Sequence, residues 1–539
     1  MNAMHPATLS RRRFLGASLA AGTSAAVRPG ARATGAPEEF DYVVVGAGSS
    51  GCVVANRLSA DPGIRVLLLE AGGRGDDPLI GDIGRWTSLL GTAADWNYAT
   101  EPEPALGGRS VKWPRGRGFG GSSAISAAAY VRGHPLDFAA WAQEAGPDWS
   151  YASVRPIFRA LEDNSRGASA LRGVGGPVAV SDTDDPHAGH LAFLEACRGL
   201  GFAADPRWDF NSEQPENGAG FYQKHLRAGR RQSAAAAFLT PVLGRANLAA
   251  RPHARVRRLL LEGTRVVGLE YLEGAPGTTP AARTVRAARE VVLCAGAIDS
   301  PRLLLLSGIG PAGALRAAGV AVRHELPGVG ANLQDHPRIG LRWAGRAPLP
   351  GSSVSGGLLA FSGLGPAGGP PDLQFAVGRG LSAPDPALAY SVIVTRVQSR
   401  GSVSLRSADP LASPVIRANY FTEERDLDVA VEGVKLGLAI GRARAFDALR
   451  GAAAEPGEGE DSPARLREFI RRTSGTIYHP AGTCRMGRGP DAVVDPALRV
   501  RGLEGLRVAD ASIMPTLLSV QTHATCLVIG ELAARFLRA

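Results

Sequence analysis

With 539 residues, the chain is long enough for more than one hydrophobic core, and its hydrophobic content of 45% is typical of a globular protein. Five of its 60 basic residues precede the first acidic residue, Glu38, and the remaining 55 nearly balance the 50 acidic residues. The net charge of +10 is therefore not concentrated in a basic segment of the kind that binds nucleic acid. The five cysteines are scattered without zinc-like or redox spacing, which argues against a metal site.

The N-terminus predicts a targeting signal. Residues 10–15 read SRRRFL, and a mild apolar run at 16–27 and a small-x-small site at 31–33 follow. This order is typical of a twin-arginine-like signal peptide over residues 1–33, which would direct export to the periplasm. A disordered basic tail on a cytoplasmic protein is the alternative. The apolar run is too short to span a bilayer and no later stretch is long enough, so no transmembrane helix is expected.

A dinucleotide-binding motif follows the predicted signal. A β-branched strand at 42–45 runs into G-x-G-x-x-G at 46–51 and a helix, and a second apolar strand ends at Glu70. The first glycine permits a tight turn, the second lets the backbone approach a pyrophosphate, and the third allows close helix–strand packing. The helix N-terminus favours phosphates, and the acid suits a ribose diol, so either FAD or NAD fits. The predicted contacts are Gly46, Gly48, Ser49, Ser50, Gly51, Glu70 and Ala71.

A second glycine- and serine-rich turn lies at residues 116–123, within the segment PRGRGFGGSSAISAAAYVRGHPLDF. Such a turn brings backbone N–H groups against an anion or a flat ring with no side chains in the way. A flexible linker would not be followed directly by apolar and aromatic residues.

Five ordered segments resemble the glucose-methanol-choline oxidoreductases: residues 114–138, 296–310, 326–337, 478–487 and 498–515. The resemblance spans about residues 40 to 539 and implies FAD as the cofactor. It also implies further FAD contacts, at Gly120, Gly121, Ser122, Ser126, Val256, Asp510, Ala511 and Gln521.

Three positions bear on the flavin environment. Phe119 stands where the family usually has Leu, Ile, Val or Trp, and Ser126 stands where it usually has Asn or His. Members that attach FAD covalently carry a histidine where this chain has Ile125. The resemblance therefore implies non-covalent FAD.

The resemblance further implies an α/β fold built from two discontinuous domains. A Rossmann-like, doubly wound FAD-binding domain would use residues 38–145, 230–338 and 474–539. A substrate domain of antiparallel sheet and helices would use residues 146–229 and 339–473, and the alternation in SVIVTRVQSRGSVSL (391–405) agrees with strands there.

The implied reaction is oxidation of a small-molecule alcohol to the aldehyde, with hydride passing to the flavin N5. The hydroxyl proton needs a base, and a neutral imidazole suits that task near pH 7. His479, in YHPAGTCRMG, occupies the position of the family's catalytic histidine. For the second catalytic position we favour His523, with Gln521 as the alternative and otherwise a hydrogen-bonding partner of the flavin edge.

The sequence narrows the possible substrates but does not identify one. Choline-oxidising members carry a carboxylate shortly after the HP of LQDHP, whereas residues 338–344 here contain two arginines and no acid. Choline is therefore disfavoured, and a primary, aromatic or medium-chain alcohol is expected. The electron acceptor stays open between oxygen, a quinone and a cytochrome. The alternative function is a flavin-binding relative without alcohol oxidation, either lyase-like or redox-inactive.

Overall fold

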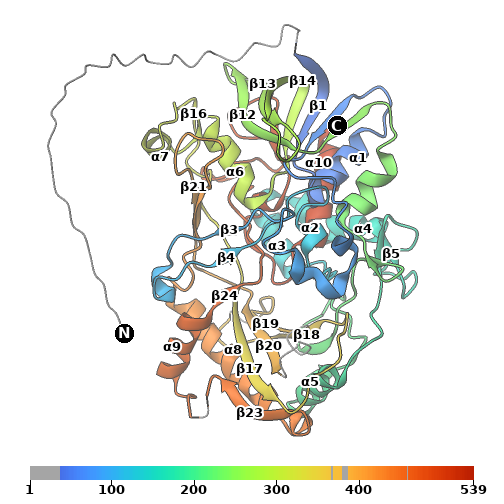
Figure 1. Ribbon diagram of the computed structural model, residues 1–539, viewed down its shortest axis with the longest axis vertical. Coiled ribbons are helices and arrows are strands. Elements are labelled where there is room, and N and C mark those ends of the chain that lie inside the picture. Colours follow the sequence, from blue (N-terminus) through green and yellow to red (C-terminus); the bar gives the residue numbers. More distant parts are fainter. Residues whose placement is uncertain (1–36, 366–367, 379–386, 458) are drawn as a thin grey trace, which may run out of the picture. The chain divides into compact units, whose positions relative to one another are not determined.

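The structure is a computed structural model that describes residues 37–365, 368–378, 387–457 and 459–539. The signal predicted over residues 1–33 lies outside the described residues, so it stays a prediction. Within Glu38–Ala539 the chain builds two large sheets (Figure 1).

The first sheet forms around strands that are apolar without interruption. The strand β1 (Glu38–Val45) ends in four residues that are almost completely buried, and all of β2 (Val66–Leu69) is buried, as expected for strands covered on both faces. The strand order is β11-β2-β1-β14-β13-β12, with β25 also paired to β14. The other strands are β11 (Leu248–Arg251), β12 (Ala254–Glu262), β13 (Arg265–Glu273), β14 (Ala281–Leu293) and β25 (Leu506–Val508).

This sheet is mixed, with parallel and antiparallel pairings. The strands β11, β2, β1, β14 and β25 pair in parallel, whereas β12, β13 and β14 form an antiparallel meander. The helix α1 (Ser49–Leu58) packs closely against α10 (His523–Arg538), because a Cβ at Gly530 would stand only 2.8 Å from the Ser50 carbonyl oxygen. The predicted fold class, α/β with a Rossmann-like half and an antiparallel half, is confirmed.

The second sheet has the order β23-β17-β20-β19-β18-β8-β7, with β24 paired to β17. Most of its pairings are antiparallel, and among the described strands of this sheet only β7 and β8 pair in parallel. The strands are β7 (Ala203–Ala204), β8 (Gly218–Phe221), β17 (Pro337–Gly345), β18 (Gly356–Ala360), β19 (Leu373–Val377), β20 (Ala387–Val394), β23 (Arg450–Glu455) and β24 (Gly475–Thr476).

One face of the second sheet is closed by α8 (Glu424–Arg442) through a glycine stripe. Gly433, Gly437 and Gly441 recur every four residues and so lie on one side of the helix. A Cβ at Gly437 would meet Leu341 Cδ1 at 2.4 Å, and one at Gly441 would meet Trp343 Cη2 at 2.2 Å. The glycines therefore let the helix backbone sit directly on the sheet, which leaves the opposite face free to line a cavity.

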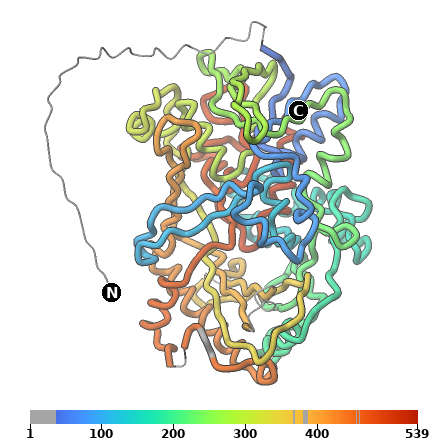
Figure 2. Tube along the Cα trace, in the orientation of Figure 1, coloured from blue at the N-terminus to red at the C-terminus, as the bar shows by residue number. Residues whose placement is uncertain are grey.

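Smaller elements connect the two sheets, and the tube in Figure 2 shows how chain segments that are distant in sequence alternate between them. The remaining helices are α2 (Ser122–Ile125), α3 (Pro135–Ala145), α4 (Tyr151–Leu161), α5 (Ala188–Gly199), α6 (Gly296–Leu306), α7 (Ala312–Ala317) and α9 (Pro463–Thr473). The remaining strands are β3 (Tyr98–Ala99), β4 (Lys112–Trp113), β5 (Glu162–Asn164), β6 (Val178–Val180), β9 (Leu226–Arg227), β10 (Arg230–Arg231), β15 (Ile309–Gly310), β16 (His324–Glu325), β21 (Ser402–Ser404) and β22 (Val415–Arg417).

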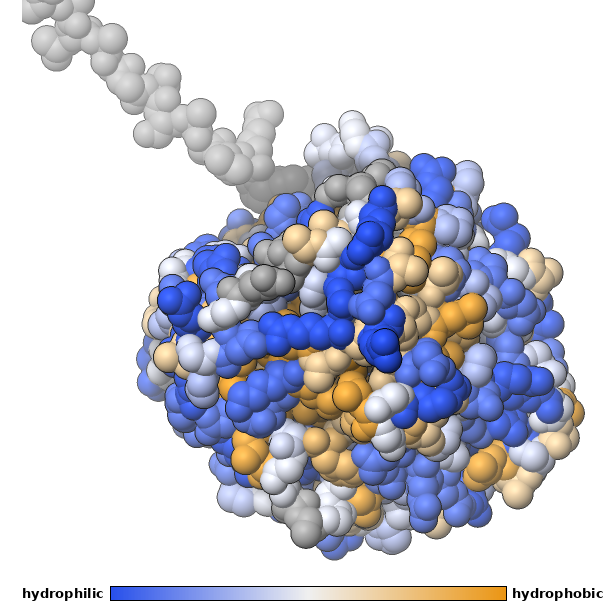
Figure 3. All heavy atoms as spheres, turned by 90° about the horizontal axis from the view of Figure 1, so that it is seen from below, coloured by the Kyte–Doolittle hydropathy of each residue, from blue (hydrophilic) through white to orange (hydrophobic). Residues whose placement is uncertain are grey.

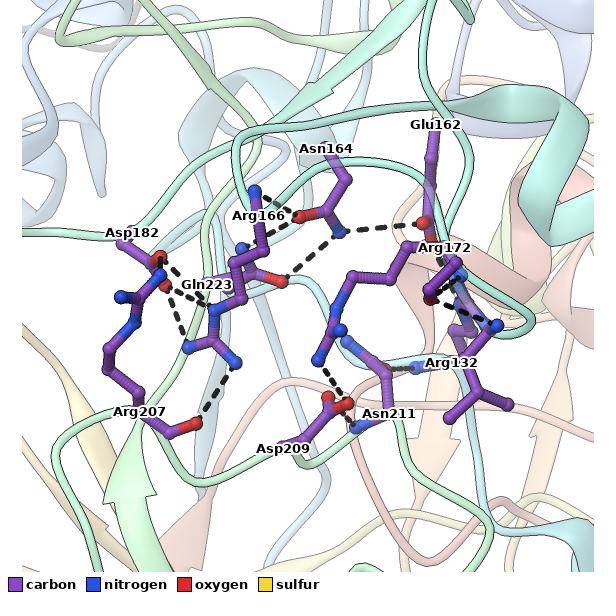
Figure 4. Close-up of polar contacts among 12 residues, drawn as sticks. Arg132, Glu162, Asn164, Arg166, Arg172, Asp182, Arg207, Asp209, Asn211 and Gln223 are labelled. Carbon is purple, nitrogen blue, oxygen red and sulfur yellow. Dashed lines mark hydrogen bonds and ion pairs between the residues drawn. The ribbon is translucent and has the colours of Figure 1, made fainter.

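A buried polar network fastens the segment around β5 to the rest of the unit (Figure 4). Arg132 donates from Nε to Glu162 Oε1 over 2.7 Å, and both side chains are almost fully buried. Asn164 and Gln223 exchange amide hydrogen bonds beside this pair. Thr525, in α10, donates from Oγ1 to the Arg132 carbonyl oxygen over 2.8 Å, so the network also reaches the last helix.

The outer surface mixes residue types. On the face that Figure 3 shows, polar and charged side chains cover most of the area and apolar ones lie between them.

No described helix is both long and apolar enough to cross a bilayer. Among the described residues, no group of three or more His, Cys, Asp or Glu could hold a metal ion, and all five cysteines are buried and free. The domain boundaries expected from the sequence stay a prediction.

Candidate active site

A cavity of about 1040 Å³ lies between the carboxyl ends of the parallel strands and the open face of the antiparallel sheet. Most of the residues singled out in the sequence line it: Gly46, Gly48, Ser49, Ser50, Glu70, Ala71, Gly121, Ser122, Ser126, Val256, His479, Asp510, Ala511, Gln521 and His523. Gly51 and Gly120 do not line the cavity. They shape its wall instead.

The G-x-G-x-x-G loop forms as the motif requires. Gly46 has a φ of +98°, and a Cβ there would stand 2.6 Å from the Cys294 carbonyl oxygen of the neighbouring strand. A Cβ at Gly51 would stand 1.9 Å from the Gly46 carbonyl oxygen, so the third glycine lets α1 begin against the turn. Gly48 is the N-cap of α1, and no side chain caps that end. The exposed helix N-terminus therefore faces the cavity as an anion-binding site.

The second glycine turn lies directly against the first. Gly120 donates its N–H to the Ala47 carbonyl oxygen over 2.8 Å, and a Cβ at Gly121 would stand 2.8 Å from Gly48 Cα. Ser122 is turned inward, since its Oγ accepts the Gly116 N–H over 3.1 Å. The two turns thus form one cradle with little side-chain bulk, open to a pyrophosphate.

Glu70 ties both turns together. Its carboxylate accepts N–H groups from Ala47 (2.9 Å), Gly72 (2.8 Å) and Gly118 (3.0 Å). Burial raises the pKa of Glu70, and the three N–H donors oppose that shift. The predicted ribose-binding acid therefore also organises the loops, a role that the sequence alone did not indicate.

Asp510 fixes the start of α6 on the opposite wall. Its Oδ2 accepts the Gly296 N–H over 2.8 Å and the Ser300 hydroxyl over 2.5 Å. Ala511 follows on the cavity surface. Ser126 lies further along, where its carbonyl oxygen accepts a hydrogen bond from the buried Arg231, and burial lowers the pKa of Arg231 to about 10.

These features fit a flavin dinucleotide. The bare helix end, the two glycine turns and the buried acid at the end of β2 are arranged as a dinucleotide demands, and the cavity continues past them toward the antiparallel sheet. The α1 end and the turn of Gly120 and Gly121 would hold the phosphates, and Glu70 the ribose.

His479 lies where the two sheets meet, and a second histidine holds its ring. His336 Nδ1 and His479 Nδ1 are 3.0 Å apart, and the two rings meet edge to face. The His479 N–H donates to Asp335 Oδ1 over 2.8 Å, which fixes the backbone of the same turn. Burial, His336 and Arg115 hold the pKa of His479 well below its usual range, so the imidazole is neutral near pH 7.

The two candidates for the second position face different neighbours. Ser49 Oγ lies 2.9 Å from His523 Nδ1, which puts the imidazole beside the N-terminus of α1. Gln521 Oε1 instead accepts a long hydrogen bond (3.5 Å) from Gln374 of β19, which also donates to the Tyr222 hydroxyl over 2.8 Å. Gln521 therefore lies on the side of the antiparallel sheet and His523 on the side of the dinucleotide loop.

Several residues of this site could not be identified from the sequence. His336 lies within the motif LQDHP, but nothing in the sequence indicates that it meets His479, 143 residues away. Tyr222 and Gln374 belong to no motif, and only the strand pairing of β8, β18 and β19 brings them to Gln521. Burial lowers the pKa of a further cavity-lining residue, Lys224, to about 7.

The chain is similar to known oxidoreductases over most of its length. Two family models described as GMC oxidoreductase match residues 40–338 and 397–530. Mitochondrial choline dehydrogenase of Homo sapiens is 40% identical over 93% of this chain and 90% of its own length, and an alcohol dehydrogenase [acceptor] of Pseudomonas putida is 38% identical over 92% and 95%. The crystal structure of pyridoxine 4-oxidase from Mesorbium loti is 38% identical, with a TM-score of 0.85 over 92% of this chain and 98% of that one.

Proposed function

Because this chain belongs to the GMC oxidoreductase family, and is thereby an FAD-type oxidoreductase acting on CH–OH donors, we propose that it oxidises a primary alcohol other than choline to the aldehyde. One observation carries the proposal: a neutral imidazole, His479, opens onto the same cavity as the dinucleotide cradle.

The reaction breaks two bonds of the CH–OH group, the O–H bond and the C–H bond. When bound, the flavin supplies the acceptor for the hydride that leaves the carbon. The protein must take the hydroxyl proton, and His479 is placed to do so. As the C=O bond forms, the proton passes to the free ring nitrogen of His479 and the electron pair of the C–H bond leaves with the hydride.

The hydrogen bond between the two histidines selects the reactive nitrogen. One of the two Nδ1 atoms must donate to the other. We infer that His479 Nδ1–H donates to His336 Nδ1, because this tautomer leaves His479 Nε2 unprotonated and able to act as the base. His336 is neutral in this arrangement, since burial lowers its pKa to about 4.

The second contact to the substrate oxygen is assigned to Gln521 in this proposal, although the sequence favoured His523. The Gln521 amide contacts Gln374 and lies beside the face of the sheet that lines the substrate side of the cavity. The His523 ring is engaged by Ser49 on the cofactor side, and burial lowers its pKa to about 4. A glutamine amide can donate to the developing alkoxide without changing its own charge.

We also propose that FAD is held without a covalent bond. Ile125, at the usual attachment position, is buried and has no nucleophilic atom. Acid precipitation of the purified protein should release the yellow cofactor into the supernatant.

Anaerobic mixing of the holoenzyme with a panel of alcohols tests the function. Bleaching of the flavin absorbance by one or more primary alcohols is expected, with choline as a weak or inactive member of the panel. Bleaching by choline alone would overturn the substrate assignment. A protein that binds FAD but bleaches with no alcohol would instead favour the lyase-like or redox-inactive alternative. Adding oxygen, a quinone or a cytochrome after bleaching would identify the acceptor by reoxidation.

A further inference from the structure

The strand β17 presents two kinds of side chain to its two faces. Ile339, Leu341 and Trp343 are buried on the face that packs against α8. The alternate residues Arg338 and Gly340 therefore face the other way, because successive side chains of a strand point to opposite faces, and His336 directly precedes the strand. Arg338 and Gly340 line the cavity, and His336 meets His479.

This alternation brings a cation close to the proposed base. Arg338 pairs with Gly475 of β24, and Gly475 lies three residues before Tyr478 in the chain. Arg338 also follows His336 by two positions. Two residues of strand advance roughly 6.7 Å. An alcohol with its hydroxyl at His479 would therefore extend toward the Arg338 guanidinium within a few bonds.

The guanidinium of Arg338 is oriented but not neutralised. Its Nη1 donates to Ser391 Oγ of the adjacent strand over 3.1 Å, and within the described ranges it pairs with no carboxylate. Four further N–H donors of the planar group remain after that bond. A partly buried cation of this kind is suited to a carboxylate or phosphate, which it can bind through two parallel hydrogen bonds.

The cavity has room for a carboxylate or phosphate beside Arg338. Gly340 pairs with Ser391, and a Cβ placed on Gly340 would meet nothing within 4 Å. The neighbouring cavity-lining residues Ala376 and Ala389 are also small. Among the described residues, no side chain therefore fills the space next to Gly340.

Of the residues that the structure describes, no carboxylate lining the cavity competes for this cation. Glu70, Asp299 and Asp510 lie on the dinucleotide side and are hydrogen-bonded there. Glu455 is exposed and stands opposite Arg342, not Arg338, in the pairing of β17 with β23. The substrate side of the cavity is thus cationic around Arg338.

From these contacts we propose that the substrate is an alcohol that carries an anionic group, and that Arg338 is the residue that binds this group. The inference rests on the proposed alcohol oxidation and adds the chemical class of the substrate. It also gives a reason why choline would be a poor substrate, since its quaternary ammonium would face a cation.

Matched aromatic alcohols test the proposal in the holoenzyme. Stopped-flow flavin reduction would compare 4-(hydroxymethyl)benzoate with its neutral methyl ester and with 4-(hydroxymethyl)-N,N,N-trimethylanilinium. We expect the ratio of the reduction rate constant to the substrate dissociation constant to be about 10- to 100-fold higher for the anion than for the ester, mainly through tighter binding, and the cation to be the poorest substrate. In Arg338→Gln the anion-to-ester ratio should fall to near one, and Arg338→Lys should retain part of it. Arg417→Gln, which removes an exposed arginine outside the cavity, should leave the wild-type ratio unchanged.

A binding measurement separates this inference from the proposed function. Titrating the oxidised holoenzyme with 4-methylbenzoate, methyl 4-methylbenzoate or 4-methylphenyl phosphate, followed by the flavin difference spectrum, requires no turnover. Tighter binding of either anion in the wild type, lost in Arg338→Gln, would support the anion site even if no alcohol were oxidised, and the better of the two anions identifies the group. Equal binding of anion and ester, or the same anion preference in Arg338→Gln, would overturn it.

Discussion

The imidazole of His479 should be needed for flavin reduction but not for flavin binding. It lies outside the glycine turns and the α1 end, so His479→Ala should retain FAD and fold normally. Its turnover should fall by roughly 10²- to 10⁴-fold, the usual contribution of a positioned base. Anaerobic stopped-flow reduction measures this step directly. A variant that reduces flavin at the wild-type rate would refute the assignment.

The pH dependence follows from the direction of the His479 shift. A lowered pKa keeps the base deprotonated at neutral pH, so activity is lost only as the pH falls through a value well below 6.5. The rate constant of flavin reduction with a neutral alcohol should therefore be level from about pH 6.5 to 9. Arg115 and His336 lower the pKa of His479 in the same direction as burial, and burial raises the pKa of the neighbouring Asp335. An acid limb with its midpoint at or above 6.5 would contradict the burial argument.

Gln521 and His523 can be ranked by single substitution. If Gln521 holds the substrate oxygen, Gln521→Ala should slow flavin reduction by about 1–3 kcal/mol of activation free energy, the cost of one lost hydrogen bond. His523→Ala should act more on FAD affinity, because its ring contacts Ser49. Measuring both the reduction rate and the FAD dissociation constant decides the matter. The reverse pattern would restore His523 to the second position.

At the scale of single residues, the glycine motif predicted local backbone geometry, whereas the partners of individual side chains could not be predicted. Gly46, Gly51 and Glu70 were recognisable because the motif imposes local backbone geometry on each. The contact between His336 and His479 was not, because it depends on the pairing of β17 with β24, which no local pattern encodes.

Among the elements, the turn around β5 depends on one buried ion pair. In Glu162→Gln the Arg132 guanidinium would remain buried without a counter-charge, so the free energy of unfolding should fall by roughly 3–5 kcal/mol. The matched control is Glu213→Gln, which removes an exposed partner of Arg155 and should cost less than about 1 kcal/mol. Denaturant unfolding of both variants measures the difference. Equal losses would show that the network in Figure 4 contributes no more than a surface pair.

Prediction of the elements succeeded where periodicity was strong. The apolar runs of β1 and β2 indicated buried parallel strands, and the alternation in residues 391–405 indicated strands, which the structure shows as parts of β20 and β21. The meander of β12, β13 and β14 was not foreseen. The strand β14 contains the polar run AARTVRAARE and becomes a strand through its neighbours, not through its own propensity.

For the whole molecule, the predicted twin-arginine-like signal has a direct test. Replacing Arg11 and Arg12 with Lys should leave unprocessed precursor in the cytoplasm, because the export machinery reads that pair. Cell fractionation with detection of the precursor and mature forms measures the outcome, and the Arg28→Lys variant serves as the control for a charge-conserving change elsewhere in residues 1–33. Normal processing of the double variant would point to another route or to no export.

The contact between α1 and α10 has a consequence for the timing of biosynthesis. Ser49 and His523 touch across 474 residues of sequence, and the Ser50 hydroxyl donates to the Cys526 carbonyl oxygen. The nucleotide-binding motif therefore emerges early from the ribosome, but its supporting helix is translated only after both sheets have been made. A chain terminated before α10 would contain the full glycine motif and still lack the helix that supports it, so we expect such a chain to bind the cofactor poorly.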